Sequence, residues 1–319
     1  MDRRAQWLRA GAGVLFVALL ALLFLRDQAV DRAPSDAGDP TVSTPDVDVP
    51  STTDTPSAPS TVPSETVPSP PEGIEELVCR QFAEPVRLRV LSFNTHRSTG
   101  SLASVAEEIN EVEPDIVLLQ EVDRQMLRTG AVDQAGLLAD ATGLDGSFSA
   151  NLSRGRGQYG TLVLSRFEIL EEGHVPLVGD RGSEPRGLQW VLVEVDGQPL
   201  RVYNTHLDTR PSVRLPQARH VAAVLREDDV PTILGGDLNA WPDSPAVGAL
   251  SRVLTDTWTA SGLGRAATGR GGRKIDYLFV GRGVRPVRSR VALSTASDHH
   301  RLWADVRLEP PRRCDDAED

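Results

Sequence analysis

The sequence predicts a single α+β domain in which strands outnumber helices. Short apolar or alternating segments recur from about residue 86 onward, and several of them are close enough along the chain to pair locally. About 225 residues of this kind fit one domain. Because each strand or helix must bury its apolar face, two packed sheets with helices outside them is the architecture that this pattern favours.

The first predicted elements are a strand, a helix and a second strand. Apolar and polar residues alternate in Arg87–Phe93, as in a half-buried strand. Helical spacing follows over Leu102–Val112, and Pro114 ends it. Asp115–Gln120 (DIVLLQ) is almost entirely apolar, which is typical of a strand buried on both faces.

The later elements follow from the same periodicities. Further strands are predicted at 161–165, 188–195, 200–205, 232–235, 275–280, 285–293 and 302–308, and further helices at 213–225 and 244–250. The dipeptide Asp196-Gly197 predicts a hairpin turn between two of these strands.

The N-terminus has the composition of a targeting segment. Three arginines precede an uncharged apolar stretch, Ala10–Leu25, which is slightly shorter than the roughly 20 residues that cross a bilayer. Arg26 and Asp27 follow it, where a cleaved signal peptide would have small residues. We therefore favour an uncleaved signal anchor over residues 1–26, with secretion after cleavage as the alternative. The basic flank predicts a single-pass protein of the cell membrane with the rest of the chain outside.

A change of composition separates this segment from the folded part. Residues 27–84 are rich in Pro, Ser, Thr and Asp and have too little apolar surface to offset chain entropy, so we predict a disordered stalk. The folded domain should span residues 85–310, and an acidic tail should span residues 311–319. The net charge of −11 follows this division, because residues 79–314 sum to zero. The acidity therefore does not exclude a polyanionic ligand of the domain itself.

Polar residues capable of metal binding or proton transfer lie at the ends of the predicted strands. They are Asn94, Glu121, His206, Asp237, Asn239, Asp276, Asp298 and His299. Because loops on a rigid scaffold commonly carry function, we expect these side chains to converge on one site. Hard oxygen ligands of this kind suit Mg²⁺ or Mn²⁺.

Seven motifs follow one another along the folded part: LSFNTH, LLQEVD, YGTLVLSR, YNTHLD, GGDLNAWPDS, IDYLFV and SDHH. Together they resemble the endonuclease/exonuclease/phosphatase superfamily, the DNase-I-like metal-dependent phosphoesterases, over residues 87–308. The resemblance implies a four-layer α/β sandwich, with two packed mixed sheets flanked by helices. It also implies hydrolysis of phosphomonoesters or phosphodiesters with a divalent cation.

The resemblance further implies roles for single residues. Glu121, with Asn94 beside it, resembles the main metal ligand of the family, and Asp298 resembles a further metal-site acid. Asp237 resembles the base that activates water. His299 resembles the histidine at the scissile phosphate, and its orienting carboxylate would be Asp276, the residue that opens IDYLFV.

A second group of residues is predicted to contact the phosphate. His206 resembles a second phosphate-binding histidine, and Asn239 would steady the phosphate or the transition state. Tyr159 occupies the position of a phosphate-contacting tyrosine, although aromatic residues at strand starts are commonly packing residues. Three basic residues of adjoining loops are expected to bind phosphate, with solvated loop charge as the alternative. These residues are Arg186, Arg273 and Lys274.

The two cysteines, Cys79 and Cys314, flank the folded domain. In the resembled fold the terminal strands are antiparallel neighbours, so both cysteines would emerge at the same end. We predict a Cys79–Cys314 disulfide, which an extracytoplasmic location permits, and the alternative is two unpaired surface thiols.

The sequence thus predicts a membrane-anchored, extracytoplasmic, Mg²⁺-dependent phosphoesterase with a monomeric catalytic domain. A lipid-linked or small-molecule phosphate ester suits a membrane tether, because the tether raises the local concentration of enzyme at the bilayer. The alternative is a secreted or surface nuclease acting on DNA or RNA, which a domain of zero net charge disfavours. A catalytically inactive ligand-binding module is a third interpretation, and the intact set of acids and histidines argues against it.

Overall fold

The structure is a computed structural model that describes residues 78–81, 84–269, 271–310 and 312–315. The predicted membrane anchor and most of the predicted stalk lie outside these residues. Among the helices that are described, none is long and apolar enough to cross a membrane.

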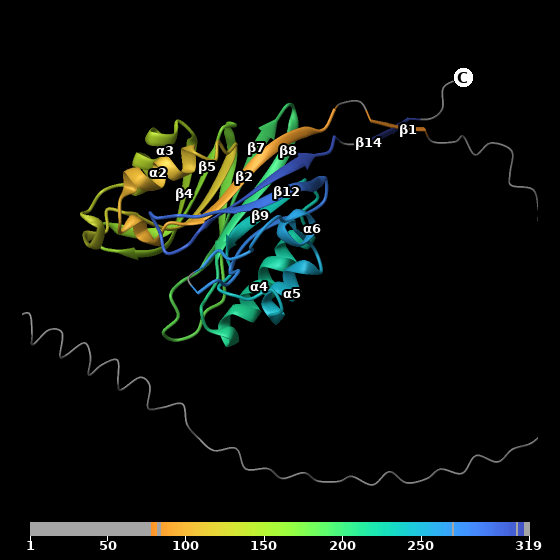
Figure 1. The fold of residues 1–319 in the computed structure, drawn as a ribbon. Coiled ribbons are helices and arrows are strands. Elements are labelled where there is room, and N and C mark those ends of the chain that lie inside the picture. Colours follow the sequence, from red (N-terminus) through yellow and green to blue (C-terminus); the bar gives the residue numbers. More distant parts are fainter. Residues whose placement is uncertain (1–77, 82–83, 270, 311, 316–319) are drawn as a thin grey trace, which may run out of the picture. The chain divides into compact units, whose positions relative to one another are not determined.

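Two six-stranded mixed sheets form the centre of the described domain (Figure 1). The first sheet contains, in spatial order, β12 (Val284–Ala292), β13 (Arg301–Leu308), β2 (Val86–Asn94), β3 (Ile116–Arg124), β5 (Gly157–Ser165) and β4 (Asp145–Arg154). The second contains β10 (Thr255–Asp256), β11 (Asp276–Val280), β9 (Thr232–Asp237), β8 (Gln198–His206), β7 (Gly187–Val195) and β6 (Ile169–Pro176). One parallel pair lies in each sheet, β2 with β3 and β8 with β9. Each of these pairs is joined by a crossover helix, as parallel pairing requires.

The helices pack against the two sheets. Their bounds are α2 (Leu102–Asn110), α3 (Gln134–Thr142), α4 (Pro211–Arg226), α5 (Pro245–Ser251) and α6 (Thr257–Ser261), with 3₁₀ turns η1 (His96–Ser98) and η2 (Leu127–Thr129). The helices α2, α3, α4 and α5 cover the outer faces of the two sheets, whereas Trp258 of α6 packs against the core between the sheets. Figure 1 shows α2 and α3 on one side of the sheets and α4 and α5 on the other. Local sequence favours these starts, since Ser101 and Ser244 cap α2 and α5 through their side chains.

Three apolar cores hold the layers together. The central core lies between the sheets and contains Val90 and Leu118 from the first sheet and Val202 from the second. The outer core of the first sheet contains Leu91 and Leu119, the sequence neighbours of Val90 and Leu118. Alternate residues of β2 and β3 thus enter different cores, as expected for strands buried on both faces. The third core joins the second sheet to α4 and α5. The predicted four-layer sandwich is confirmed.

The predicted strands and helices all occur, although the structure contains elements that the sequence pattern did not reveal. The helices α3 and α6 and the strands β4, β6 and β10 were not predicted. These three strands lie at sheet edges, and β4 (DGSFSANLSR) and β6 (ILEEGHVP) are largely polar because much of their surface faces water. Apolar alternation is therefore too weak to identify them.

The boundaries of the stalk and tail also differ from the prediction. The strand β1 (Val78–Gln81) lies within the range assigned to the stalk, and it pairs in antiparallel fashion with β14 (Arg312–Asp315), which lies within the predicted tail. The two segments extend from β2 and β13, which are antiparallel neighbours, so they leave the sheet side by side. In the register of this pair, Cys79 is directly opposite Cys314.

Candidate active site

The predicted site residues come together at one end of the two sheets. Asp237 is the last residue of β9, and its cross-strand partners are His206, which ends β8, and Asp276, which opens the antiparallel strand β11. Strand pairing alone therefore places three functional side chains in one row. Asn94 ends β2 in the facing sheet and donates a hydrogen bond of 3.0 Å from Nδ2 to Asp237 Oδ2. This bond joins the two sheets at the site.

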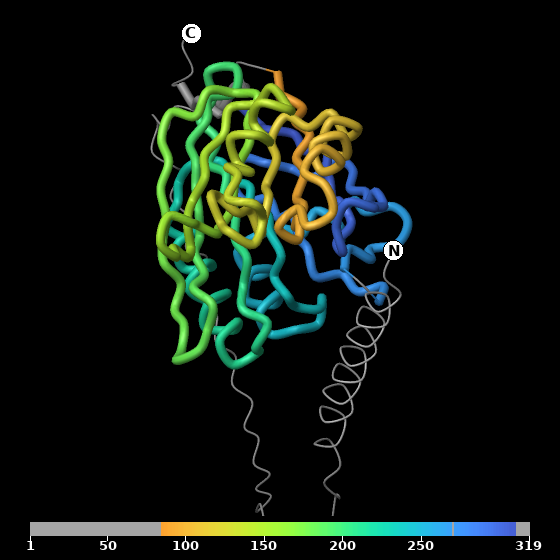
Figure 2. Tube along the Cα trace, turned by 90° about the vertical axis from the view of Figure 1, so that its left-hand side faces the viewer, coloured from red at the N-terminus to blue at the C-terminus, as the bar shows by residue number. Residues whose placement is uncertain are grey.

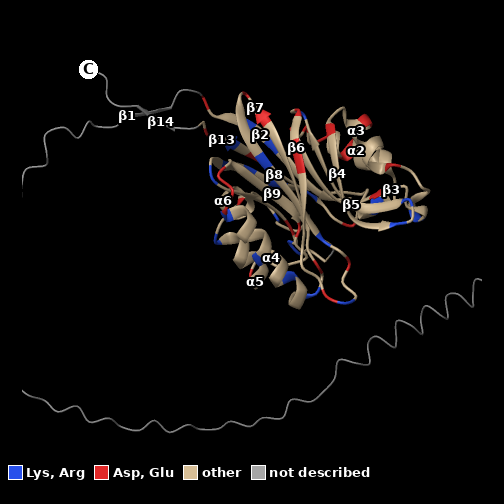
Figure 3. Ribbon diagram, turned by 180° about the vertical axis from the view of Figure 1, so that it is seen from behind, with Lys and Arg blue, Asp and Glu red and all other residues tan. Residues whose placement is uncertain are grey.

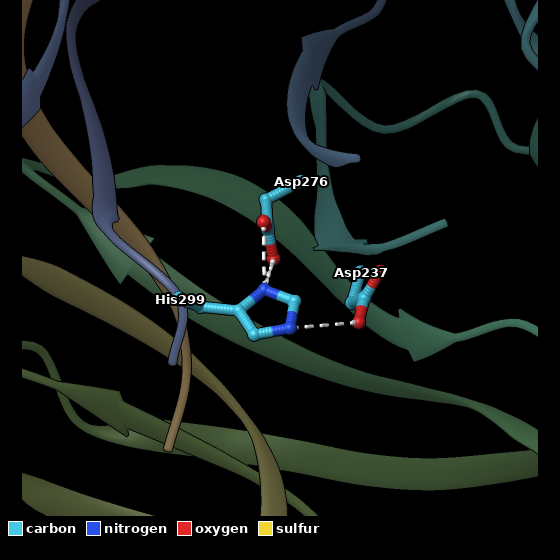
Figure 4. A group of neighbouring side chains, drawn as sticks. All are labelled: Asp237, Asp276 and His299. Carbon is cyan, nitrogen blue, oxygen red and sulfur yellow. Dashed lines mark hydrogen bonds and ion pairs between the residues drawn. The ribbon is translucent and has the colours of Figure 1, made fainter. Parts of the chain in front are cut away.

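Figure 4 shows the buried centre of the site, in which His299 lies between two carboxylates. Its Nδ1 is 2.9 Å from Asp276 Oδ2 and 3.1 Å from Oδ1. Its Nε2 is 3.7 Å from Asp237 Oδ2. Asp276 thus fixes the ring and the tautomer, and it leaves Nε2 facing Asp237 and the open side of the site.

Burial and charge shift the pKa values of these groups. Burial lowers the pKa of His299, but the Asp276 carboxylate beside it outweighs burial, and the pKa rises to about 10. Burial, followed by repulsion from Asp276, raises the pKa of Asp237 to about 7. His299 is therefore a cation at neutral pH, and Asp237 can exchange a proton near neutrality. Such paired shifts are typical of acid–base sites.

Glu121 reaches the site through an irregularity in β3. The register between β3 and β5 shifts between Leu119 and Val122, and Glu121 has a positive φ of 58°. A bulge of this kind turns a side chain out of its regular direction, at a cost that functional sites commonly carry. Glu121 Oε1 lies 3.3 Å from Asn94 Nδ2, so one amide group bridges Glu121 and Asp237.

His206 and Asn239 form a second pair beside Asp237. The Asn239 side-chain amide lies 3.0 Å from His206 Nε2 and 2.9 Å from the Leu207 carbonyl oxygen, to which it donates. Burial, helped by the positive charges of Arg186 and His299, holds the pKa of His206 well below its ordinary value. His206 is therefore neutral, and its Nε2 accepts the hydrogen bond from Asn239.

Arg186 and Tyr159 complete one wall of the site. Arg186 is buried, and its Nε has no hydrogen-bond partner among the residues that the structure describes. Burial and the nearby Glu121 charge raise the pKa of Tyr159, and the Arg186 guanidinium opposes this rise. Arg186 Nη1 is 3.0 Å from Glu184 Oε1, and the guanidinium charge acts on His206 of the site. A buried guanidinium whose Nε donor is unused is suited to bind a phosphate oxygen.

The structure does not bring all of the predicted basic residues into the site. Lys274 is buried, and its Nζ is 3.0 Å from Asp256 Oδ2 and above the Tyr277 ring. Burial lowers the pKa of Lys274 to about 8, although Asp256 opposes this. Arg273 is exposed and stacks on Trp241 with 4.5 Å between its Cζ and the ring centroid. The contacts of Lys274 are those of a structural ion pair and differ from the predicted phosphate contact.

Two further residues at the site carried no predicted role. His96 and Arg97 belong to a turn with positive φ angles that follows β2 directly. Arg97 Nε is 3.3 Å from Glu121 Oε2, and His96 Nδ1 is 3.5 Å from Asp298 Oδ1. The turn therefore places the Arg97 guanidinium beside Glu121 and the His96 ring beside Asp298. The position of His96 at the end of the LSFNTH motif was the one sequence signal that could have identified the turn.

The donor set at the site can hold a metal ion. Ligand atoms of Asp237, Asp276 and His299 all lie within 4.8 Å of one another, so this group could bind one. Glu121 adds a carboxylate that Asn94 links to Asp237. The set thus contains the carboxylates of Asp237, Asp276 and Glu121 and the imidazole of His299, and carboxylate oxygens suit hard divalent cations.

The four-layer sandwich and the convergent acids and histidines define a DNase-I-like hydrolase. The chain belongs to the endonuclease/exonuclease/phosphatase family, whose model matches residues 91–299. This match runs from β2 to His299, so it includes Asp237, Asp276 and His299.

Solved structures agree with this assignment. An endonuclease/exonuclease/phosphatase from Beutenbergia cavernae is 26% identical, with a TM-score of 0.60 and 72% of each chain covered. A mannosyl-6-phosphatase from Bacteroides thetaiotaomicron is 20% identical, with a TM-score of 0.57 and 69% of this chain and 99% of the other covered. The human Nocturnin catalytic domain is 19% identical, with a TM-score of 0.54 and 72% of this chain and 96% of the other covered. The curated proteins contain no match to the chain.

Proposed function

We propose that the chain is a Mg²⁺-dependent phosphoesterase that the N-terminal segment holds at the outer face of the cell membrane. Its substrate would be a small-molecule or lipid-linked phosphate ester. The observation that carries the proposal is the His299–Asp276 dyad, which faces a buried Asp237 carboxylate. The buried Arg186 guanidinium lies near His206, which is the neighbour of Asp237 in the sheet. Together these residues supply an acid, a base and an anion-binding group within one site.

The residues divide the chemistry between them. Asp237, with its pKa raised toward neutrality, accepts a proton from the attacking water. The His299 imidazolium, oriented by Asp276, donates a hydrogen bond to a phosphate oxygen as negative charge develops there. Arg186 binds a second phosphate oxygen. Mg²⁺, bound through Glu121, Asn94 and Asp298, would neutralise charge on the phosphate.

The substrate class is inferred from charge and from one relative. The folded domain has no net charge, and Figure 3 shows basic and acidic residues interspersed over the described elements. A nuclease that grips a long polyanion would need a continuous basic groove. The mannosyl-6-phosphatase among the solved structures shows that this fold accommodates a phosphatase of small molecules.

Hydrolysis assays test the proposal. The full-length chain would be assayed with Mg²⁺, Mn²⁺ or EDTA against monoester and diester model compounds, phosphorylated lipids, sphingomyelin, plasmid DNA and RNA. We expect metal-dependent turnover of a small or lipid-linked ester, lost in EDTA and in His299→Ala. The matched control is His220→Ala, because His220 lies on α4. Turnover unchanged in His299→Ala contradicts the proposed site, and DNA or RNA degradation at the rate of the best ester favours the nuclease.

The location of the chain needs a separate test. The apolar stretch Ala10–Leu25 and its basic flank support an anchor with the folded domain outside. We expect the intact protein in the membrane fraction, with the folded domain degraded by protease added to whole cells. A mature protein that begins after residue 26 and is found in the medium would show signal cleavage and secretion.

A further inference from the structure

A cavity of about 570 Å³ lies next to the active site, and Asp298 is the one residue of the proposed site that lines it. Its lining includes Leu263, Arg265, Arg290, Leu293, Asp298 and His300. This volume is in the range of pockets that hold small organic ligands. The lining combines apolar side chains with two arginines, and Asp298 is the acid among these six residues.

The cavity is built from two segments that are hydrogen-bonded to each other. Both are blue in Figure 2, and they belong to the loop before β11 and to the end of β12 with the turn that follows it. The Leu263 amide donates to the Ser289 carbonyl at 3.1 Å, and the His300 amide donates to the Thr268 carbonyl at 2.6 Å. The walls are therefore fixed in position relative to each other.

The same loop connects the cavity to the catalytic dyad. The Thr268 hydroxyl accepts a hydrogen bond of 3.0 Å from the Asp276 amide, while the Thr268 carbonyl accepts the one from His300. His299 lies between two lining residues in the chain, Asp298 and His300, and its ring turns to Asp276. A ligand in the cavity would thus border the position of the phosphate.

The polar groups of the cavity favour an anion. Within the described part of the chain, neither Arg265 nor Arg290 forms an ion pair with an acid. The Asp298 carboxylate also lines the cavity, and its Oδ1 lies 3.5 Å from His96 Nδ1. Because the two guanidiniums outnumber this one carboxylate, the lining favours a negatively charged group.

The apolar residues favour an organic group. Leu293 is 74% exposed and Leu263 is 51% exposed, so large aliphatic side chains face solvent at the cavity. Covering them with an apolar ligand would remove that surface from water. An anionic group and an apolar body are thus both accommodated in one space beside the phosphate position.

We propose that this cavity binds the alcohol part of the substrate, and that the preferred substrate is a phosphate ester of an apolar alcohol that carries a second anionic group. The inference rests on the proposed phosphoesterase function and names the substrate class of that same site. Arg265 and Arg290 would bind the second anion, and Leu263 and Leu293 would cover the apolar part.

A binding experiment without turnover tests this inference independently of the enzymatic activity. The probe is naphthalene-1-sulfonate, titrated calorimetrically in EDTA into the full-length chain in zwitterionic nanodiscs, with empty nanodiscs as the blank. Arg265→Gln and Arg290→Gln should each weaken binding about tenfold, the loss expected for a charge-assisted hydrogen bond. Arg282→Gln, at the other end of β11, is the matched control and should leave binding unchanged. Neutral 1-naphthalenemethanol and methanesulfonate should each bind more weakly than the probe.

The outcomes separate the inference from the proposed function. Binding that is absent, or that is equally strong in Arg290→Gln and Arg282→Gln, overturns the cavity assignment even if the chain hydrolyses phosphate esters. Arginine-dependent binding by a chain that hydrolyses no phosphate ester leaves the cavity in place and refutes the phosphoesterase. With an active chain, a sulfonate on 1-naphthyl phosphate should lower KM in the wild type and leave KM unchanged in Arg290→Gln.

Discussion

Replacing Asp276 by asparagine should remove the charge that keeps His299 protonated. The Asp276 carboxylate lies 2.9 Å from His299 Nδ1 and raises the pKa of that ring to about 10, against the effect of burial. Without this carboxylate only the smaller effects of Asp237 and Asp298 oppose burial, so the pKa of His299 should fall well below 10. Each unit of that fall corresponds to about 1.4 kcal/mol less stabilisation of the imidazolium.

The consequence for catalysis should be large. At pH 7.5 a smaller fraction of His299 is protonated in Asp276→Asn, and its tautomer is no longer fixed by a carboxylate. An imidazole that loses its orienting carboxylate can lose up to about 10⁴-fold in rate. We expect kcat to fall by at least about 10³-fold, with a smaller change in KM, because the substrate still contacts Arg186.

The assay is a pH titration of the ¹⁵N-histidine-labelled protein by NMR, in EDTA, with turnover measured in parallel. Asp229→Asn, at an exposed site paired with Arg282, is the matched control and should leave the His299 titration unchanged. A pKa of His299 near 6.5 in the wild type would refute the reasoning. A pKa that stays near 10 in Asp276→Asn would instead assign the stabilising charge to another acid.

Three further predictions follow from the site and the chain ends. Glu121→Gln should weaken Mg²⁺ binding by at least about tenfold in calorimetry, whereas unchanged affinity would place the metal on the Asp237 cluster alone. The pKa of Asp237 is raised to about 7 in the folded state, so the wild-type apoprotein should lose unfolding free energy as pH rises from about 4 to 7. Asp237→Asn should abolish that loss, so at pH 8 its free energy of unfolding, measured with denaturant, should exceed that of the wild type by up to about 4 kcal/mol. Parallel plots of unfolding free energy against pH for the two proteins would contradict this. A Cys79–Cys314 disulfide should add about 4–5 kcal/mol to the free energy of unfolding, and reduction should remove this gain. Free thiols at both positions in non-reducing peptide mapping would exclude the disulfide.

The sequence by itself determined the layers of the fold and most of the catalytic centre. Strand and helix periodicity is local, so DIVLLQ identified a doubly buried strand before any packing was known. The predicted dyad of His299 and Asp276 is present in the structure, and Asp237 faces it. Asn204 of the YNTHLD motif has a structural role, since its amide donates to the carbonyls of Leu119 and Leu162.

Only the tertiary structure decided which basic side chains enter the site. Arg186 and Lys274 both lie in polar loops next to motifs, and no local pattern separates them. Packing directs Arg186 toward Tyr159 and directs Lys274 into an ion pair with Asp256, a partner 18 residues away. An ion pair of this kind depends on which elements become neighbours in space.

The tertiary structure also decided features that depend on contacts between segments far apart in the chain. The bulge that redirects Glu121 arises from pairing with β5, and the cavity at Arg265 and Arg290 arises from a loop resting on β12. The ends of the domain pair because β2 and β13 are neighbours. Residue type and local spacing determine which chemistry is available, whereas strand register and long-range packing determine which side chains share a site.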